Sequence, residues 1–120
     1  MKIPEGQKER VAKMLFNTVY PLYVVKVQKK NRTEEELQEV ICWLTGFTFS
    51  QLQESIVSSV SFQEFFDQAK LNENATLITG TICGYRIEEI EDPLIKKVRM
   101  LDKLVDELAK GRKMEKILRV

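Results

Sequence analysis

The stretch that decides the fold is "PLIKKVRMLDKLVDELAKG", residues 93–111. Its apolar side chains recur at alternating steps of four and three residues, and two flanking positions widen this seam into a core-facing face. The seam consists of Leu94, Ile95, Val98, Leu101, Leu104, Val105 and Leu108. Asp92 before Pro93 is typical of a helix start, and Lys110 before Gly111 is typical of a helix end. Burying these side chains gives on the order of 10 to 20 kcal/mol of gross apolar stabilisation, so we predict that this helix organises the fold.

Three more helix starts are predicted by capping boxes, in which a Ser or Thr hydroxyl accepts a hydrogen bond from the third helical N–H and a Glu or Gln reaches back. The pairs are Thr33 with Glu36, Thr48 with Gln51, and Ser61 with Glu64. An apolar stripe at helical spacing follows each box. The stripes are Leu37, Val40, Ile41 and Leu44, then Phe49, Leu52 and Ile56, then Phe62, Phe65, Phe66 and Ala69. Gly46 suits the left-handed end of the first of these helices.

Two segments leave the secondary structure open. In "YPLYVVKVQKK", residues 20–30, three valines favour a strand, whereas Pro21 at a first-turn position and the basic end favour a helix. We prefer the helix there. Residues 75–83 are β-branched and alternating, yet no pairing partner is evident elsewhere in the chain. A helical turn and a short strand both remain open for that segment.

Length and composition indicate one domain. A chain of 120 residues with 43% hydrophobic content can bury a single core. We expect a mainly α fold, a compact helical bundle of about five to six helices over residues 14–120, with room for one short extended segment near 76–83. Residues 1–13 mix proline, glycine and charge without a firm period, so we expect a flexible N-terminal segment with regular structure beginning near Met14.

The residue inventory excludes several kinds of chemistry. The chain contains no histidine. It therefore lacks the base of the usual Ser and Cys catalytic triads and the commonest ligand of transition metals. Cys42 and Cys83 lie far apart and form no C-x-x-C pair, which argues against a zinc knuckle and a dithiol redox site. We expect no catalytic residues, no metal and no cofactor, and an enzyme is the less favoured interpretation.

The charge balance bears on partners and location. Nineteen basic residues against eighteen acidic ones give a net charge of +1, which provides no field to attract a polyanion, so nucleic-acid binding is disfavoured. We interpret the basic run Lys26, Lys29, Lys30 and Arg32 as a solvated face. The first ten residues do not resemble a signal peptide and no apolar run could span a bilayer. We therefore expect a cytoplasmic protein with reduced thiols and no membrane association.

The segment "TGTICGYR", residues 79–86, allows two interpretations. Cys83 beside a helix start, with Arg86 nearby, would have a favoured thiolate. Alternatively a helix simply begins here and a small thiol is buried under a turn, which we prefer because no base accompanies the cysteine. If a ligand site exists, its candidate residues are Cys83, Tyr85, Arg86 and Trp43. The carboxylates of residues 88–92 lack the spacing of a calcium loop and are interpreted as acidic residues before a helix start.

Several long blocks occur together in an order that resembles a known family. They are "VYPLYV" (19–24), "ICWLTGF" (41–47), "LITGTICGYRIEEIEDPL" (77–94) and "LDKLVDELAKGRKMEKILR" (101–119). They resemble the bacterial family called domain of unknown function 2200, and the resemblance covers nearly everything from Met14 on. It implies a small stand-alone prokaryotic protein without an assigned activity and offers no catalytic residue to carry over.

Two functions are therefore considered. The first is a non-enzymatic helical module that contacts a second copy or another protein, with the helix over residues 93–110 packing in the domain and against the partner. The second is a small-molecule or anion site around residues 79–92, with or without enzymatic activity.

Overall fold

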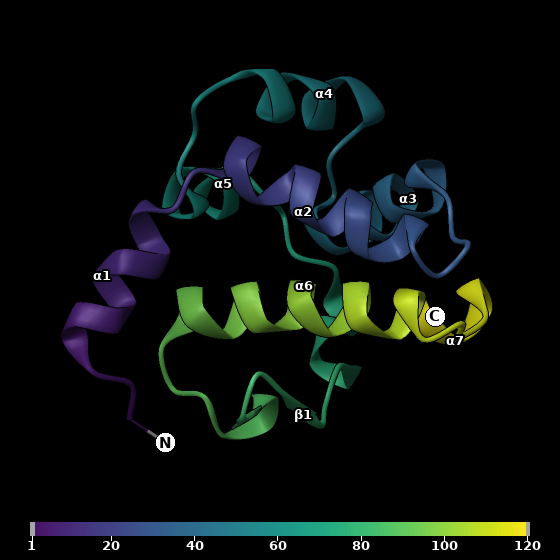
Figure 1. Cartoon of the computed structure of the whole chain (residues 1–120). Coiled ribbons are helices and arrows are strands. Elements are labelled where there is room, and N and C mark those ends of the chain that lie inside the picture. The colour runs from purple at the N-terminus through teal and green to yellow at the C-terminus, as the bar shows by residue number, and fades with distance from the viewer. Residues whose placement is uncertain (1, 120) are drawn as a thin grey trace.

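Helix α6, Pro93–Ala109, runs through the middle of the molecule in the computed structural model, which describes residues 2–119 (Figure 1). Its seam is buried as predicted, with Leu94 half-buried at the start and Ile95, Val98, Leu101, Leu104, Val105 and Leu108 at most 3% exposed. The Asp92 side chain accepts a hydrogen bond from the Ile95 N–H at 2.9 Å, and Pro93 occupies the first turn. Gly111 follows the helix with a φ of 87°. The prediction that this helix organises the core is confirmed.

The other helices surround α6. Helices α2, Phe16–Gln28, and α3, Glu34–Thr45, pack on α6 and on each other, and α4, Phe49–Val57, covers α2 and α3. Helices α1, Glu5–Lys13, and α5, Phe62–Asp67, pack together at the N-terminal end of α6, and α7, Met114–Ile117, packs at its other end (Figure 1). The Cα radius of gyration is 13.5 Å, close to the roughly 13.6 Å expected of a compact domain of this length. The mainly α, compact fold is confirmed.

All three capping boxes form. The backbone N–H groups of Glu36, Gln51 and Glu64 each donate to the hydroxyl of their cap residue at 3.1 Å. Helix α3 ends at Gly46, whose φ is 73°. A Cβ at this position would lie 2.7 Å from the Lys70 carbonyl oxygen, so both the backbone conformation and the close approach require glycine.

One stripe residue is placed differently from the prediction. Phe49 is 58% exposed, whereas Leu52 behind it is fully buried. Phe49 is the first residue of α4 and projects beyond the core, and Phe47, just before the cap, is buried in its place. The ring of Phe47 packs edge-on against Phe65 at 5.2 Å between centroids, next to the stacked pair of Phe16 and Phe65 at 4.1 Å.

The helix preferred over residues 20–30 is confirmed as part of α2, but its start was wrongly placed. It begins at Phe16, so Pro21 is its sixth residue. A backbone bridge sets this start: the Phe16 N–H donates to the Val60 carbonyl and the Phe62 N–H donates to the Met14 carbonyl, both at 2.8 Å. Pro21 is solvent-exposed and contributes no N–H donor to the helix.

Residues 73–89 contain both of the alternatives left open. A short 3₁₀ helix, η1, spans Glu73–Leu77, and strand β1, Thr81–Ile82, pairs antiparallel with β2, Tyr85–Arg86. The pairing partner follows directly, through a two-residue turn in which Cys83 and Gly84 have φ values of 52° and 81°. The preferred interpretation of residues 79–86 was therefore wrong: these residues form a hairpin, no helix begins among them, and Cys83 is exposed. A second 3₁₀ helix, η2, follows at Ile87–Glu89.

The N-terminal segment also differs from expectation. Regular structure begins with α1 at Glu5, not near Met14, and Ile3 and Val11 are buried against the rest of the domain. These two buried side chains hold the segment against the domain, which the irregular charge pattern of the sequence did not indicate. The flexibility of residues 1–13 stays a prediction.

Candidate interaction surface

The four predicted ligand residues lie in two places. Cys83, Tyr85 and Arg86 share the β1–β2 hairpin, which packs on one side of α6, and Trp43 lies on α3 on the other side (Figure 1). Arg86 is exposed and its Nε lies 3.5 Å from a carboxylate oxygen of Glu89. Trp43 is half-buried beside the chain that follows α5. The hairpin thus brings three of the residues together and leaves Trp43 apart, and a ligand role for them stays a prediction.

Tyr85 belongs to a polar cluster that joins four elements. The Gln7 side chain donates to the Tyr85 hydroxyl at 2.6 Å, and the Arg99 guanidinium lies 5.3 Å from the Tyr85 ring centre. Arg99 also donates to Asp102 at 2.7 Å, and the Tyr23 hydroxyl donates to the other Asp102 oxygen at 2.6 Å. Burial, followed by the nearby Asp102 carboxylate, raises the pKa of Tyr23 well above its ordinary value. Tyr23 is therefore a neutral donor that ties α2 to α6, not a nucleophile.

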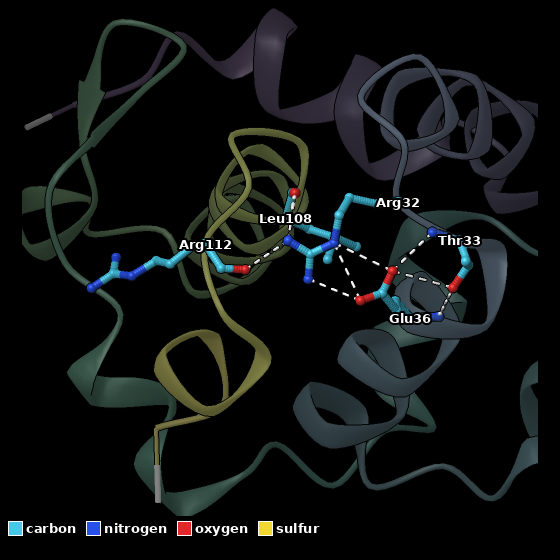
Figure 2. A network of polar contacts seen from close by, with 5 residues as sticks. All are labelled: Arg32, Thr33, Glu36, Leu108 and Arg112. Carbon is cyan, nitrogen blue, oxygen red and sulfur yellow. Dashed lines mark hydrogen bonds and ion pairs between the residues drawn. The ribbon is translucent and has the colours of Figure 1, made fainter.

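The prediction that Arg32 belongs to a solvated face, made from the basic residues near it in sequence, was wrong. Figure 2 shows its guanidinium between the end of α6 and the start of α3. It donates to the Arg112 carbonyl at 2.7 Å and pairs with the Glu36 carboxylate at 2.9 Å, while the other Glu36 oxygen accepts from the Thr33 N–H at 2.9 Å. The hydrogen bonds that the Glu36 carboxylate accepts lower its pKa, and the one from the Arg32 guanidinium has the largest effect. The network joins the ends of two helices and has a structural role.

A second group of charged side chains holds the C-terminal segment against α6. Glu107 is buried, and its carboxylate accepts from Arg119 at 2.7 and 2.8 Å and from Arg112 at 3.0 Å. Two guanidinium groups thus compensate one buried carboxylate, which would be strongly destabilising without them. The arrangement leaves this carboxylate no free oxygen with which to act as a catalytic base.

Apolar side chains remain exposed on two neighbouring helices. Leu22 and Val25 on α2 are 64% and 48% exposed, and Phe49 and Val57 on α4 are 58% and 79% exposed. Helices α2 and α4 pack against each other at one side of the molecule (Figure 1). The sequence predicted Phe49 to be part of a core stripe and did not indicate the other three, although Leu22 and Val25 fall outside the buried helical stripe of α2.

A shallow groove lies between α3 and α4. It is lined by Glu35, Gln38, Glu39 and Cys42 from α3 and by Phe49 from α4. Burial raises the pKa of the Cys42 thiol, so this side chain is neutral and behaves as a small apolar group. Apolar surface therefore lies beside two exposed carboxylates, a combination that suits a helix bearing apolar and basic side chains.

A more polar pocket lies between α4 and α5. Its lining residues are Phe47, Gln51, Glu54, Ser55, Ser58, Val60 and Gln68. Ser55 is only 7% exposed and lines this pocket. With the Gln51, Glu54, Ser58 and Gln68 side chains, it gives the pocket a polar lining.

Comparison with known proteins settles the family. A family model described as "Uncharacterized protein conserved in bacteria (DUF2200)" matches residues 10–119. The chain belongs to the DUF2200 family. The match takes in the end of α1 and all elements from α2 to α7, so the resemblance inferred from the sequence blocks is confirmed.

This DUF2200 chain is also similar to a solved structure titled "Crystal structure of uncharacterized protein SP1917". The two are 40% identical, the similarity covers 92% of this chain and 91% of that chain, and the TM-score is 0.87. No curated protein matches the DUF2200 chain. Between residues 2 and 119, no group of three or more Cys, Asp or Glu side chains is placed to hold a metal ion, and no helix is both long and apolar enough to cross a bilayer.

Proposed function

We propose that this DUF2200 protein is a non-enzymatic interaction module that associates with a second copy through exposed apolar side chains on α2 and α4. The observation that carries the proposal is the exposure of Leu22, Val25, Phe49 and Val57 on two helices that pack together. Exposed apolar side chains on neighbouring helices favour an interface, because burying each one is worth roughly 1.5 to 3 kcal/mol. The net charge of +1 adds no strong repulsion between copies.

The surface differs from the one expected from the sequence. The seam of α6 is buried inside its own domain, with Leu101, Leu104 and Leu108 fully covered, so a second copy cannot reach it without unfolding. A charge placed in that seam would destroy the fold and would say nothing about association. Helices α2 and α4 offer apolar side chains that can be changed without touching the core.

The test is sedimentation equilibrium over a micromolar concentration range. We expect a monomer–dimer equilibrium for the unchanged chain and a monomer for Leu22→Asp combined with Val25→Asp, with the same helical circular dichroism. Leu77→Asp is the matched control, because Leu77 is 55% exposed but lies in η1, outside α2 and α4. A monomer for the unchanged chain at several hundred micromolar would refute the proposal.

A second candidate function is small-molecule binding, and the mixed aromatic and polar lining favours the α4–α5 pocket over residues 79–92 as its place. The pocket combines a buried aromatic ring, Phe47, with hydroxyl and amide groups and the single carboxylate of Glu54. A small organic cation fits that lining. Titration with choline, followed by backbone amide NMR, should shift signals of residues 51–58, and Glu54→Gln should remove the shifts. Absence of any choline-dependent shift would eliminate this candidate.

A further inference from the structure

The groove between α3 and α4 has an acidic end and an apolar end. Glu35, Glu39 and Cys42 lie at steps of four and three residues along α3, so their side chains share one face of the helix. Phe49 extends the apolar end. In the part of the chain that the structure describes, neither Glu35 nor Glu39 has an ion-pair partner. The two carboxylates are therefore available to basic groups from outside.

The exposed face of α2 carries the opposite chemistry. Leu22, Val25 and Lys29 lie at steps of three and four residues, from the middle of α2 to its C-cap, and all three are exposed. No carboxylate between residues 2 and 119 pairs with Lys29. Among residues 2–119, this face thus offers two apolar side chains followed by a lysine that makes no ion pair.

The two faces match in register. Leu22 and Lys29 are seven residues apart, and so are Cys42 and Glu35, which corresponds to about 10.5 Å along each helix at 1.5 Å per residue. Setting Leu22 on the apolar end and Lys29 on the acidic end requires the helices to run antiparallel. That direction also places the negative end of one helix dipole beside the positive end of the other.

We propose that the α3–α4 groove of one copy receives the exposed face of α2 from a second copy. Leu22 and Val25 contact Cys42 and Phe49, and the Lys29 ammonium lies beside the Glu35 and Glu39 carboxylates. This inference rests on the proposed self-association and specifies which surfaces meet. In a two-fold dimer the same pairing occurs twice, because each copy supplies both surfaces.

Charge reversal tests the pairing. Lys29→Glu or Glu39→Lys alone should each raise the dissociation constant of the dimer about tenfold to thirtyfold, since repulsion replaces attraction at two symmetric contacts. The chain carrying both changes should bind more tightly than either single variant and recover part of the lost affinity, because attraction between positions 29 and 39 is restored while Glu35 keeps its charge. Lys116→Glu and Glu115→Lys on α7 are the matched controls, with the same changes in charge at exposed positions away from the groove.

The two cysteines give an independent readout in the unchanged protein. Cys42 lines the groove and Cys83 is exposed in the hairpin turn. As protein concentration rises through the dissociation constant, the iodoacetamide labelling rate of Cys42 should fall relative to that of Cys83, measured by peptide mass spectrometry. A constant ratio would contradict the seating of α2 on the groove.

The outcomes separate this inference from the proposed function. Suppose that Leu22→Asp with Val25→Asp disrupts the dimer, that neither charge reversal weakens it, and that the reactivity of Cys42 does not change with concentration. That result would overturn the pairing and retain self-association. Weakening by both single reversals without recovery in the double change would also overturn the pairing. A monomer at all concentrations would refute both, and protection of Cys42 only upon addition of another protein would assign the groove to a different partner.

Discussion

Replacing Arg32 with methionine should destabilise the domain far more than its place in a basic run suggests. The change keeps the apolar stem and removes the guanidinium. The bond to the Arg112 carbonyl, at 2.7 Å from an ionised donor, contributes roughly 1.5 to 3 kcal/mol. The partly exposed pair with Glu36 adds roughly 0.2 to 1 kcal/mol, and the 3.4 Å contact with the Leu108 carbonyl adds little. The expected loss is about 2 to 4 kcal/mol.

The assay is urea and thermal unfolding followed by circular dichroism. For a domain of this size the loss corresponds to a decrease in Tm of about 8 to 16 °C. The slope of the unfolding free energy against urea concentration should stay unchanged. Lys30→Met is the matched control, because Lys30 is an exposed neighbour with no ion pair in the described chain, and it should change stability by less than about 0.5 kcal/mol. If Arg32→Met were as stable as Lys30→Met, the guanidinium would not join the ends of α3 and α6 in solution.

Three further predictions follow from local geometry. Gly46→Ala should lower the stability by about 2 to 4 kcal/mol, measured by urea unfolding, because a Cβ meets the Lys70 carbonyl and φ is positive; a change below about 0.5 kcal/mol would contradict it. The lowered pKa of Glu36 contributes stability that is present above the unfolded pKa of about 4.3 and is lost as pH falls through the folded pKa. Glu36→Gln should therefore reduce the difference in unfolding free energy between neutral pH and pH about 3, and an unaltered pH profile would argue against that linkage. Cys83→Asn should raise the stability by about 0.5 to 1 kcal/mol in the same assay, because asparagine tolerates the positive φ of this turn better than cysteine does; a lower urea midpoint would show that the turn is not the one described.

The helix starts were predictable because their determinants are local. A cap hydroxyl and the N–H it accepts from lie within three residues, so Thr33, Thr48, Ser61 and Asp92 could be identified without knowledge of the fold. The α6 seam was predictable for a similar reason, since its periodicity extends over four turns. Whether the seam is buried within the domain or against a partner could not be predicted, because this depends on helices distant in sequence.

Long-range contacts decided the features that were missed. The start of α2 is set by a bridge to residues 60–62, and Arg32 binds carbonyls 76 and 80 residues further along the chain. The hairpin turn was hidden because cysteine rarely adopts a positive φ, so Cys83–Gly84 lacks the usual Asn-Gly signal. For the candidate surface, Leu22 and Val25 could have been recognised as apolar residues outside the buried stripe, but the groove beside Phe49 depends on how α4 sits against α3.

The position of α6 along the chain affects how the protein is made. Helices α2, α3 and α5 all rest on a helix that begins at Pro93, so the ribosome produces them before the surface they need exists. Until α6 emerges, the faces of α2, α3 and α5 that pack on it stay uncovered and can be recognised by chaperones that bind unfolded chains. The native core can therefore be completed only after residues 93–109 have been translated, when the early helices can dock onto a late one.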